Sequence, residues 1–193
     1  PWKKGGKTSW IADGTGDNYG QHGSVDGDHG RPASCYPALN IGGIVVKKVC
    51  AVILAAGDGK RMKSAKPKAL KEVLFKPMLN WVIDAVKKSG IEQIAVIVGT
   101  GADMVRECLP KGVVSIEQKE RLGTGHAVMQ AREYIKETGC ESVIVLTGDA
   151  PFVDSDAIMG SYDLHEKTRS AATIVAADVK DPTGYGRIVC NQI

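Results

Sequence analysis

Short apolar segments alternate with segments of helical spacing along the chain from Val49 onward, and this alternation constrains the fold more than any other feature. The intervening segments carry apolar residues three and four positions apart, and Gly90 and Gly139 stand where helices are expected to end. We therefore predict an α/β fold with a doubly wound, mainly parallel sheet whose two faces are both covered by helices. The apolar runs, which have the length and β-branched content of buried strands, are residues 50–54, 94–98, 113–116, 142–147 and 171–177.

Ligands of doubly wound sheets bind beyond the carboxyl ends of the strands. The loops after Leu54, Ile116 and Leu146 begin at such ends, and each carries polar or glycine residues. We therefore expect these three loops to converge on one crevice.

The first of these loops is rich in glycine and is followed by cations. Gly57 and Gly59 let successive backbone amides point into one concavity, an arrangement that binds anions such as phosphate. Arg61 closes the loop, and Lys68 follows a proline that restricts the local backbone. The loop has no Lys-Ser or Lys-Thr pair, so it is not a Walker A motif, and Met62 stands where a dinucleotide fingerprint needs a third glycine.

The second loop combines an amide side chain with a glycine and a hydroxyl. Gln118 offers a donor and an acceptor side by side, which matches the edge of a pyrimidine base. Gly123 lets the backbone approach a base, and Thr124 adds a hydroxyl. From the residues alone, a polar loop before an N-capped helix is the simpler interpretation. We interpret His126 as a packing or capping residue.

The third loop places Asp149 between a glycine and an Ala-Pro turn at the end of a buried strand. A carboxylate held in this way is suited to a hard cation such as Mg²⁺. The alternative is an Asx turn or an N-cap for the next helix, a role that Asp154 and Ser155 fit better. A fourth glycine-containing stretch at 181–188 has the composition of a hairpin or bulge turn.

Composition excludes several classes of protein. The net charge is only +3, and the densest basic segment, from Lys60 to Lys76, has few aromatic residues, so we expect no nucleic-acid partner. The longest apolar run, Val49 to Ala56, is far shorter than the roughly 20 residues that span a bilayer, and no segment resembles a secretory signal. Its five cysteines are scattered and odd in number, which is typical of reduced thiols in a cytoplasmic protein.

Residues 1–46 differ from the rest because they are crowded with Gly, Asp, Ser and Asn and lack any apolar period. We expect an irregular or disordered extension there, with an extraneous or mis-joined segment as the alternative, and a partial domain over residues 47–193. Asp26, Asp28 and Gly30 do not complete an EF-hand, because Arg31 stands where that loop needs its glycine.

Several of these segments resemble known motifs. The string from Leu54 to Met62, continued by Pro67-Lys68 and Lys76-Pro77-Met78, resembles the signature of sugar-1-phosphate nucleotidyltransferases, although the family usually has a small residue at the position of Lys60. The segments 118–127 and 182–187 resemble those of N-acetylglucosamine-1-phosphate uridylyltransferases. The resemblance implies a Rossmann-like sheet of the nucleotidyltransferase type.

It also implies an activity and a site. The expected reaction transfers UMP from UTP to N-acetylglucosamine 1-phosphate, giving pyrophosphate and UDP-N-acetylglucosamine, a precursor of peptidoglycan and the cell wall. Asp149 would bind Mg²⁺, Arg61 and Lys68 would neutralise phosphate charge, and the backbone of Gly186 would contact the sugar. The nucleotide contacts carried over by the resemblance are Leu54, Ala55, Ala56, Gly57, Gly59, Gln118, Gly123 and Thr124.

The chain also departs from the bacterial bifunctional enzyme of this type. It ends before the acid and amide positions that complete the sugar pocket and the asparagine that shares the metal. It lacks the hexapeptide repeats of the β-helix that carries acetyltransfer and makes the homotrimer. We therefore expect a domain truncated on its C-terminal side. A related pyrophosphorylase with another sugar or nucleotide and a non-catalytic nucleotide-binding module are the alternatives.

Overall fold

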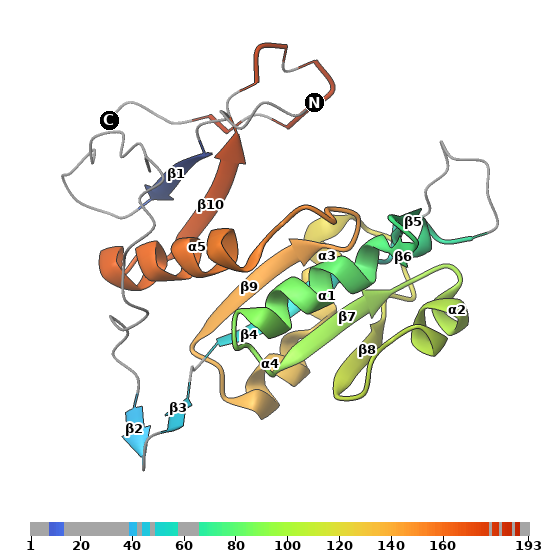
Figure 1. Cartoon of the computed structure of the whole chain (residues 1–193), viewed down its shortest axis with the longest axis horizontal. Helices are drawn as coiled ribbons and strands as arrows, with labels where there is room; N and C mark the ends of the chain where they lie inside the picture. Colours follow the sequence, from blue (N-terminus) through green and yellow to red (C-terminus); the bar gives the residue numbers. More distant parts are fainter. Residues whose placement is uncertain are drawn as a thin grey trace. The chain divides into compact units, whose positions relative to one another are not determined.

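The computed structural model describes residues 8–13, 39–41, 44–46, 49–57, 66–177, 179–181, 183–186 and 188–189. They form two compact units, Tyr36–Tyr162 and a second unit made of Pro1–Cys35 with Asp163–Ile193. The order of elements in Figure 1 follows the predicted alternation from β4 onward.

The larger unit is built on a parallel sheet of four strands in the order β8-β7-β4-β9. The predicted runs correspond closely to these strands, and β-branched residues dominate them because both faces of the sheet are covered. The strands are β4 (Val49–Leu54), β7 (Ile94–Val98), β8 (Val113–Glu117) and β9 (Ser142–Thr147).

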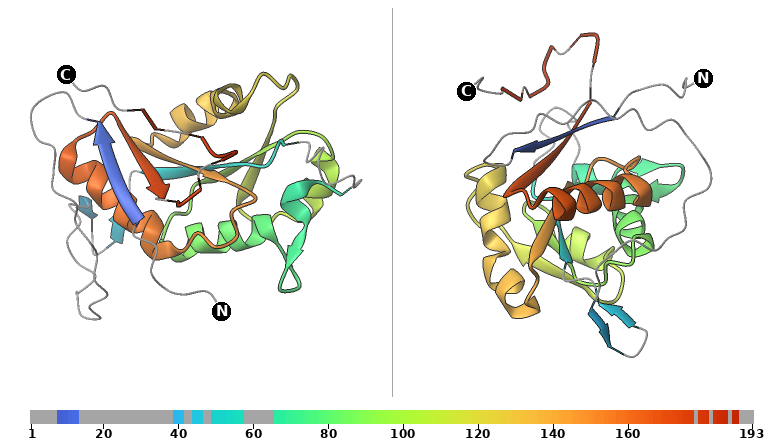
Figure 2. Two further views of the ribbon diagram at one scale, coloured as in Figure 1. Left: turned by 90° about the horizontal axis from the view of Figure 1, so that it is seen from above. Right: turned by 90° about the vertical axis from the view of Figure 1, so that its left-hand side faces the viewer.

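Helices pack on both faces of this sheet, as the alternation predicts. Ala51 and Ile53 of β4 join the larger core cluster, whereas Val52 faces the smaller one. The larger cluster includes side chains of α1 (Met78–Lys88), α2 (Ala102–Glu107) and α5 (Ser155–Thr168). The smaller one includes side chains of α3 (Thr124–Gln130) and α4 (Arg132–Thr138). Figure 2 shows α1 and the α3–α4 pair on opposite sides of the strands.

This arrangement defines where a ligand can bind. The chain runs from β4 outward to β7 and β8, and then returns to the other side of β4 to form β9. The helices that connect β4, β7 and β8 cover one face, and those that lead to β9 cover the other. The strand order therefore reverses at β4, between β7 and β9, and sheets of this kind bind their ligands beside such a reversal.

Smaller elements lie at the margins of the sheet. A single turn of 3₁₀ helix, η2 (Lys68–Leu70), precedes a hairpin of β5 (Glu72–Val73) and β6 (Lys76–Pro77). β2 (Leu39–Ile41) and β3 (Ile44–Val46) form a second hairpin.

The structure differs from the expected organisation in two respects. The predicted strand at 171–177 is present as β10 (Ala172–Ala177), but it is not part of the parallel sheet. It pairs antiparallel with β1 (Thr8–Asp13), which lies in the stretch expected to be irregular, as do β2 and β3. The boundaries of the two compact units fall near residues 35 and 162, and β1 belongs to the same unit as its partner strand β10.

The described residues include three of the five cysteines and helices whose length and apolarity can be compared with the requirements of a membrane span. Cys50, Cys108 and Cys140 are free thiols, whereas Cys35 and Cys190 lie outside the described part of the chain. Among the described helices, none combines the length and apolarity needed to cross a bilayer.

Candidate functional site

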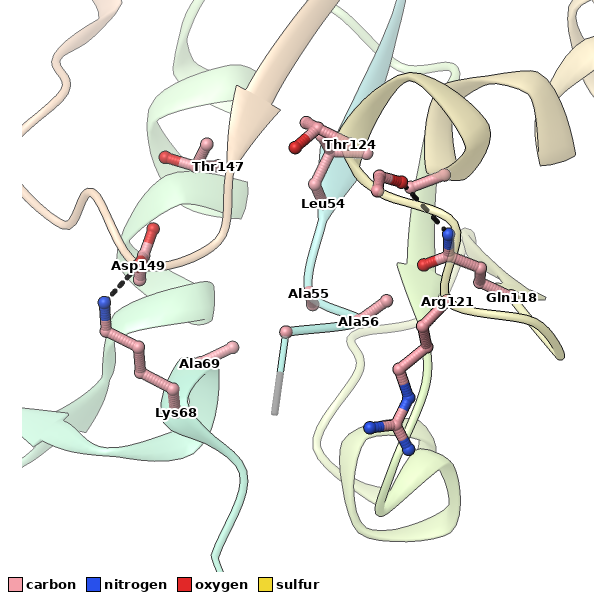
Figure 3. A pocket seen from close by; sticks show the side chains of 13 residues that line it. Leu54, Ala55, Ala56, Lys68, Ala69, Gln118, Arg121, Thr124, Thr147 and Asp149 are labelled. Atoms are coloured by element: carbon pink, nitrogen blue, oxygen red, sulfur yellow. Dashed lines mark hydrogen bonds and ion pairs between the residues drawn. The ribbon is translucent and has the colours of Figure 1, made fainter. Parts of the chain in front are cut away.

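A pocket of about 400 Å³ opens at the carboxyl end of the parallel sheet. It lies wholly within the larger unit, and Figure 3 shows how its side chains are arranged around the end of β4. Its lining residues are Leu54, Ala55, Ala56, Gly57, Lys68, Ala69, Gln118, Arg121, Gly123, Thr124, Ala127, Thr147 and Asp149.

The three loops expected to converge do so at this pocket. Main-chain hydrogen bonds join the first residues of each loop to a neighbouring strand end. The amide of Ala55 donates to Ile97 O at 2.8 Å, and that of Gln118 donates to Val98 O at 2.8 Å. The amide of Gly148 donates to Leu54 O, also at 2.8 Å. The sheet hydrogen bonding thus continues past the strands and holds the loops in place.

One side of the pocket carries an ion pair between Lys68 and Asp149. Lys68 Nζ lies 2.5 Å from Asp149 Oδ2, and the two side chains are 41% and 34% exposed. Lys68 projects from η2, which begins after Pro67, and Asp149 follows β9 by two residues. The pair brings together two residues that are distant in sequence and were each predicted to belong to the site.

The Asp149 carboxyl is held in its charged form. Partial burial raises its pKa, but the hydrogen bond and charge of Lys68, with hydrogen bonds from Thr147 and from its own backbone amide, outweigh burial. The pKa of Asp149 therefore lies below its ordinary value. At neutral pH this side of the pocket holds a paired carboxylate and ammonium group.

The opposite side of the pocket carries Gln118, which is only 5% exposed. Its Nε2 donates to Gly123 O at 3.2 Å and lies 3.0 Å from His126 Nδ1. Gly123 has φ 99°, a backbone conformation that favours glycine, and it precedes the first residue of α3, Thr124. Thr124 lines the pocket, and it is not the residue that caps α3.

Four lining residues were missed by the sequence reasoning: Ala69, Arg121, Ala127 and Thr147. Arg121 lies in the same loop as Gln118 and donates a hydrogen bond to Thr100 Oγ1. Thr147 ends β9 directly opposite Leu54 in the sheet register, so its position at a strand end was a usable signal. Ala69 and Ala127 have no polar side chain by which a site residue could be recognised.

Other predicted site residues are not brought to this pocket by the described structure. Gly59 and Arg61 lie outside the described residues. Gly186 belongs to the other compact unit. By contrast, Asp154 Oδ1 accepts a hydrogen bond of 2.8 Å from the amide of Ala157, which confirms Asp154 as the residue that caps α5.

The polar groups of the pocket fit a magnesium ion only together with a ligand. Within the described residues no cluster of three or more His, Cys, Asp or Glu side chains could hold a metal ion. Asp149 supplies one carboxylate, and Mg²⁺ is commonly bound by one or two carboxylates completed by phosphate oxygens and water. A single carboxylate is compatible with such an ion only if the ligand's phosphates and water supply the remaining oxygens.

Comparisons with known proteins assign the chain to a family and agree with its fold. Residues 51–192 match the family model described as the MobA-like NTP transferase domain. The chain is 48% identical over 141 residues to the "Bifunctional protein GlmU" of Clostridium beijerinckii, and 46% identical over 144 residues to that of Clostridium acetobutylicum. These alignments cover 72% and 74% of this chain, respectively, and 31% of each relative.

A solved structure gives the same fold. The Rv0371c homologue from Mycobacterium sp. strain JC1 superposes with a TM-score of 0.54 at 21% identity, covering 62% of this chain and 61% of that one. At this identity the likeness concerns the fold alone. The chain spans about a third of the length of the curated relatives that it matches.

Proposed function

Because the chain belongs to the family of MobA-like NTP transferase domains, we propose that it is the nucleotide-binding part of a UDP-N-acetylglucosamine pyrophosphorylase. In this proposal the whole enzyme transfers UMP from UTP to N-acetylglucosamine 1-phosphate. The observation that carries it is the pocket itself, where Lys68 and Asp149 lie on one side and Gln118 on the other, with the end of β4 between them (Figure 3). The similarity to the GlmU proteins supports the choice of substrates.

The proposed roles divide the pocket between base and phosphates. Uracil would lie against Gln118, Gly123 and Thr124, which line one side. The phosphates would follow the backbone from Leu54 to Gly57 toward Lys68. We assign Gly59 and Arg61 to the same phosphate loop, and the backbone of Gly186 to the sugar.

The chemistry needs charge neutralisation more than covalent help. An oxygen of the sugar phosphate attacks the α-phosphorus of UTP, the bond from that phosphorus to the bridging oxygen breaks, and pyrophosphate leaves with the electron pair. The attacking phosphate is already anionic near neutral pH, so no general base is required. Lys68 would stabilise the charge on the phosphoryl oxygens as the reaction proceeds.

We assign Mg²⁺ as the cofactor and Asp149 as the residue that would hold it. The ion, when bound, would neutralise phosphate charge and orient the triphosphate. Lys68 Nζ pairs with Asp149 Oδ2, so a cation held by Asp149 would compete with the ammonium group for this carboxylate.

The cellular setting is part of the proposal. Free thiols at Cys50, Cys108 and Cys140 favour a reducing compartment, and we assign the protein to the cytoplasm. We also propose that the longer parent protein is a homotrimer that contributes to peptidoglycan and cell-wall synthesis. Its mass in solution tests the assembly.

The test is a pyrophosphate-release assay with UTP, N-acetylglucosamine 1-phosphate and Mg²⁺. It is run on this chain and on a longer protein that contains it. We expect magnesium-dependent release by the longer protein and a preference for UTP over other nucleotides. Binding of UTP without any release by either protein would identify a non-catalytic module. A preference for another sugar phosphate would identify a related pyrophosphorylase.

A further inference from the structure

The imidazole of His126 lies between two glutamine side chains. Gln118 Nε2 is 3.0 Å from His126 Nδ1, and Gln130 Nε2 is 3.2 Å from His126 Nε2. Each amide nitrogen also reaches a backbone carbonyl, at Gly123 O for Gln118 and at His126 O for Gln130. His126 does not line the pocket, but it contacts a residue that does.

Counting donors shows that the two amides cannot both donate to this ring. A neutral imidazole has one accepting and one donating nitrogen, so one of the two amides must present its oxygen instead. Gln118 is 5% exposed, and turning it would bring its oxygen against Gly123 O. Turning Gln130 likewise gives up its hydrogen bond to His126 O and brings its oxygen toward that carbonyl, but Gln130 is only partly buried, so water can replace the lost hydrogen bond.

The burial of Gln118 decides between these arrangements. Leaving a buried donor or acceptor unpaired costs about 1–3 kcal/mol, and the cost is smaller where water has access. Gln118 therefore keeps its amide nitrogen toward His126 Nδ1, which accepts the hydrogen bond. The Nε2–H group of His126 then donates to the side-chain oxygen of Gln130, whose amide is flipped so that its oxygen and nitrogen exchange places.

The consequence for the pocket follows directly. Both amide hydrogens of Gln118 are used inside the protein, one by Gly123 O and one by His126 Nδ1. Only the amide oxygen of Gln118 remains for a ligand, and Figure 3 shows it turned toward the interior of the pocket. Among the described residues no donor is paired with this oxygen.

We infer that His126 is a positioning residue that fixes the Gln118 amide with its accepting oxygen toward the base. The inference rests on the proposed function, and it gives a reason for the pocket to bind uracil in preference to cytosine. Uracil presents a donating N3–H group to the oxygen, whereas cytosine in the same place presents an accepting N3. If the ribose and phosphates hold the base in place, the accepting N3 of cytosine lies against the Gln118 amide oxygen, which is also an acceptor, and no hydrogen bond forms.

The first experiment measures binding of UTP and of CTP, each with Mg²⁺, by calorimetry. The proteins are the unmodified chain, His126→Phe, which removes the acceptor, and His126→Asn, whose Oδ1 can replace Nδ1. We expect the ratio of UTP to CTP affinity to fall about tenfold in His126→Phe, the equivalent of one hydrogen bond. The Asn variant should retain most of the ratio. A ratio unchanged in His126→Phe would overturn the inference, as would an equal loss in both variants.

A second measurement needs neither a variant nor a nucleotide. ¹⁵N chemical shifts of the His126 ring distinguish the two neutral tautomers in the unmodified chain. The inference requires a proton on Nε2 and none on Nδ1, and a proton found on Nδ1 would overturn it. Absence of all nucleotide binding would instead refute the proposed function, and the tautomer would still decide the role of His126.

Discussion

Lys68 illustrates how one side chain connects distant parts of the chain. It follows Pro67 on a single turn of 3₁₀ helix, yet its ammonium group reaches a carboxylate beyond the end of β9. The pair is only partly buried, and ion pairs with access to water contribute little to stability. The pair is better understood as a charged group held where a phosphate would need it, which makes Lys68 the residue whose removal tests the site most directly.

Replacing Lys68 by alanine should lower turnover on the order of 100-fold or more, comparable to removal of one preorganised donor in other enzymes. Steady-state assays on the longer protein measure the change. The matched control is Lys66→Ala, because Lys66 forms an ion pair of 2.9 Å with Glu72 and does not line the pocket. A loss of only a few-fold in Lys68→Ala would contradict the assignment, as would an equal loss in the control.

The same substitution should raise the pKa of Asp149, which Lys68 holds below its ordinary value. Because this pKa is lower in the folded than in the unfolded chain, the interaction stabilises the fold above the unfolded pKa of about 4. That contribution is lost as the pH falls through the folded pKa. Carboxyl ¹³C titration of the unmodified chain and of Lys68→Ala measures the shift, and identical titration midpoints would contradict the prediction.

The tip of the β5–β6 hairpin stores strain at another residue. Leu74 and Phe75 form its two-residue loop, and both have positive φ, 51° and 61°. Phe75 is also 98% exposed, so its ring packs against nothing that compensates. Turns of this kind favour Asn and Gly.

Phe75→Gly should therefore raise the free energy of unfolding by about 0.5–1 kcal/mol. The left-handed conformation costs a residue with a Cβ roughly 1–2 kcal/mol, and the greater backbone entropy of glycine offsets part of the gain. Urea denaturation measures the change in the free energy of unfolding. Phe75→Ala is the control, because it removes the ring and keeps the strain, and its stability should remain nearly unchanged. Equal gains in both variants would point to the exposed ring instead.

At the scale of the secondary-structure elements, the chain segments that follow β4 and β7 lie close together at Gly99. A Cβ built there would lie 2.7 Å from Ala56 O and 3.1 Å from Ala56 Cα. Those atoms belong to the backbone of the loop that lines the pocket, so they cannot move aside without moving the loop. Gly99 thus permits the close approach of two strand ends on which the pocket depends.

Gly99→Ala should lower the free energy of unfolding by about 1–3 kcal/mol, the usual cost of overpacking, and it should weaken UTP binding. Denaturation and calorimetry measure the two effects. Gly125→Ala is the control for stability, since no atom lies within 4 Å of the Cβ that it adds and alanine favours a helix. Equal stability of Gly99→Ala and this control would show that the backbone of Ala56 can move away from residue 99, which would contradict the prediction.

At the scale of the whole molecule, one compact unit contains the pocket and the other contains the terminal segments. Every residue lining the pocket falls within Tyr36–Tyr162. β1 and β10 belong to the other unit, where each is the partner of the other in a two-stranded sheet. The terminal segments are therefore expected to affect the stability of that unit more than nucleotide affinity.

Removal of residues 1–35 should leave the Kd for UTP within about twofold of its original value, a change below 0.5 kcal/mol. The amides of β10 should exchange faster with solvent, because they lose the strand that protects them. Calorimetry and hydrogen exchange measure the two outcomes. A large loss of UTP affinity would show that the pocket depends on the N-terminal segment after all.

Local pattern was enough to locate most elements and several candidate site residues. The strands Ile94–Val98 and Ser142–Thr147 occur where the apolar runs predict them. Gln118 and Asp149 were identifiable because polar residues that follow a buried strand must lie at one edge of a parallel sheet. Information of this kind is carried by neighbouring residues, so it can be recognised without knowing the fold.

Pairing and side-chain geometry were decided only in the tertiary structure. Nothing within Thr8–Asp13 indicates that it pairs with Ala172–Ala177, because the partners are some 160 residues apart and their register depends on how the chain folds. His126 has the sequence context of an ordinary helical residue, and its relation to Gln118 rests on a distance of 3.0 Å. Sequence alone determined the sheet and the edge at which the pocket opens, whereas contacts between distant residues decided which groups line that pocket and how they are oriented.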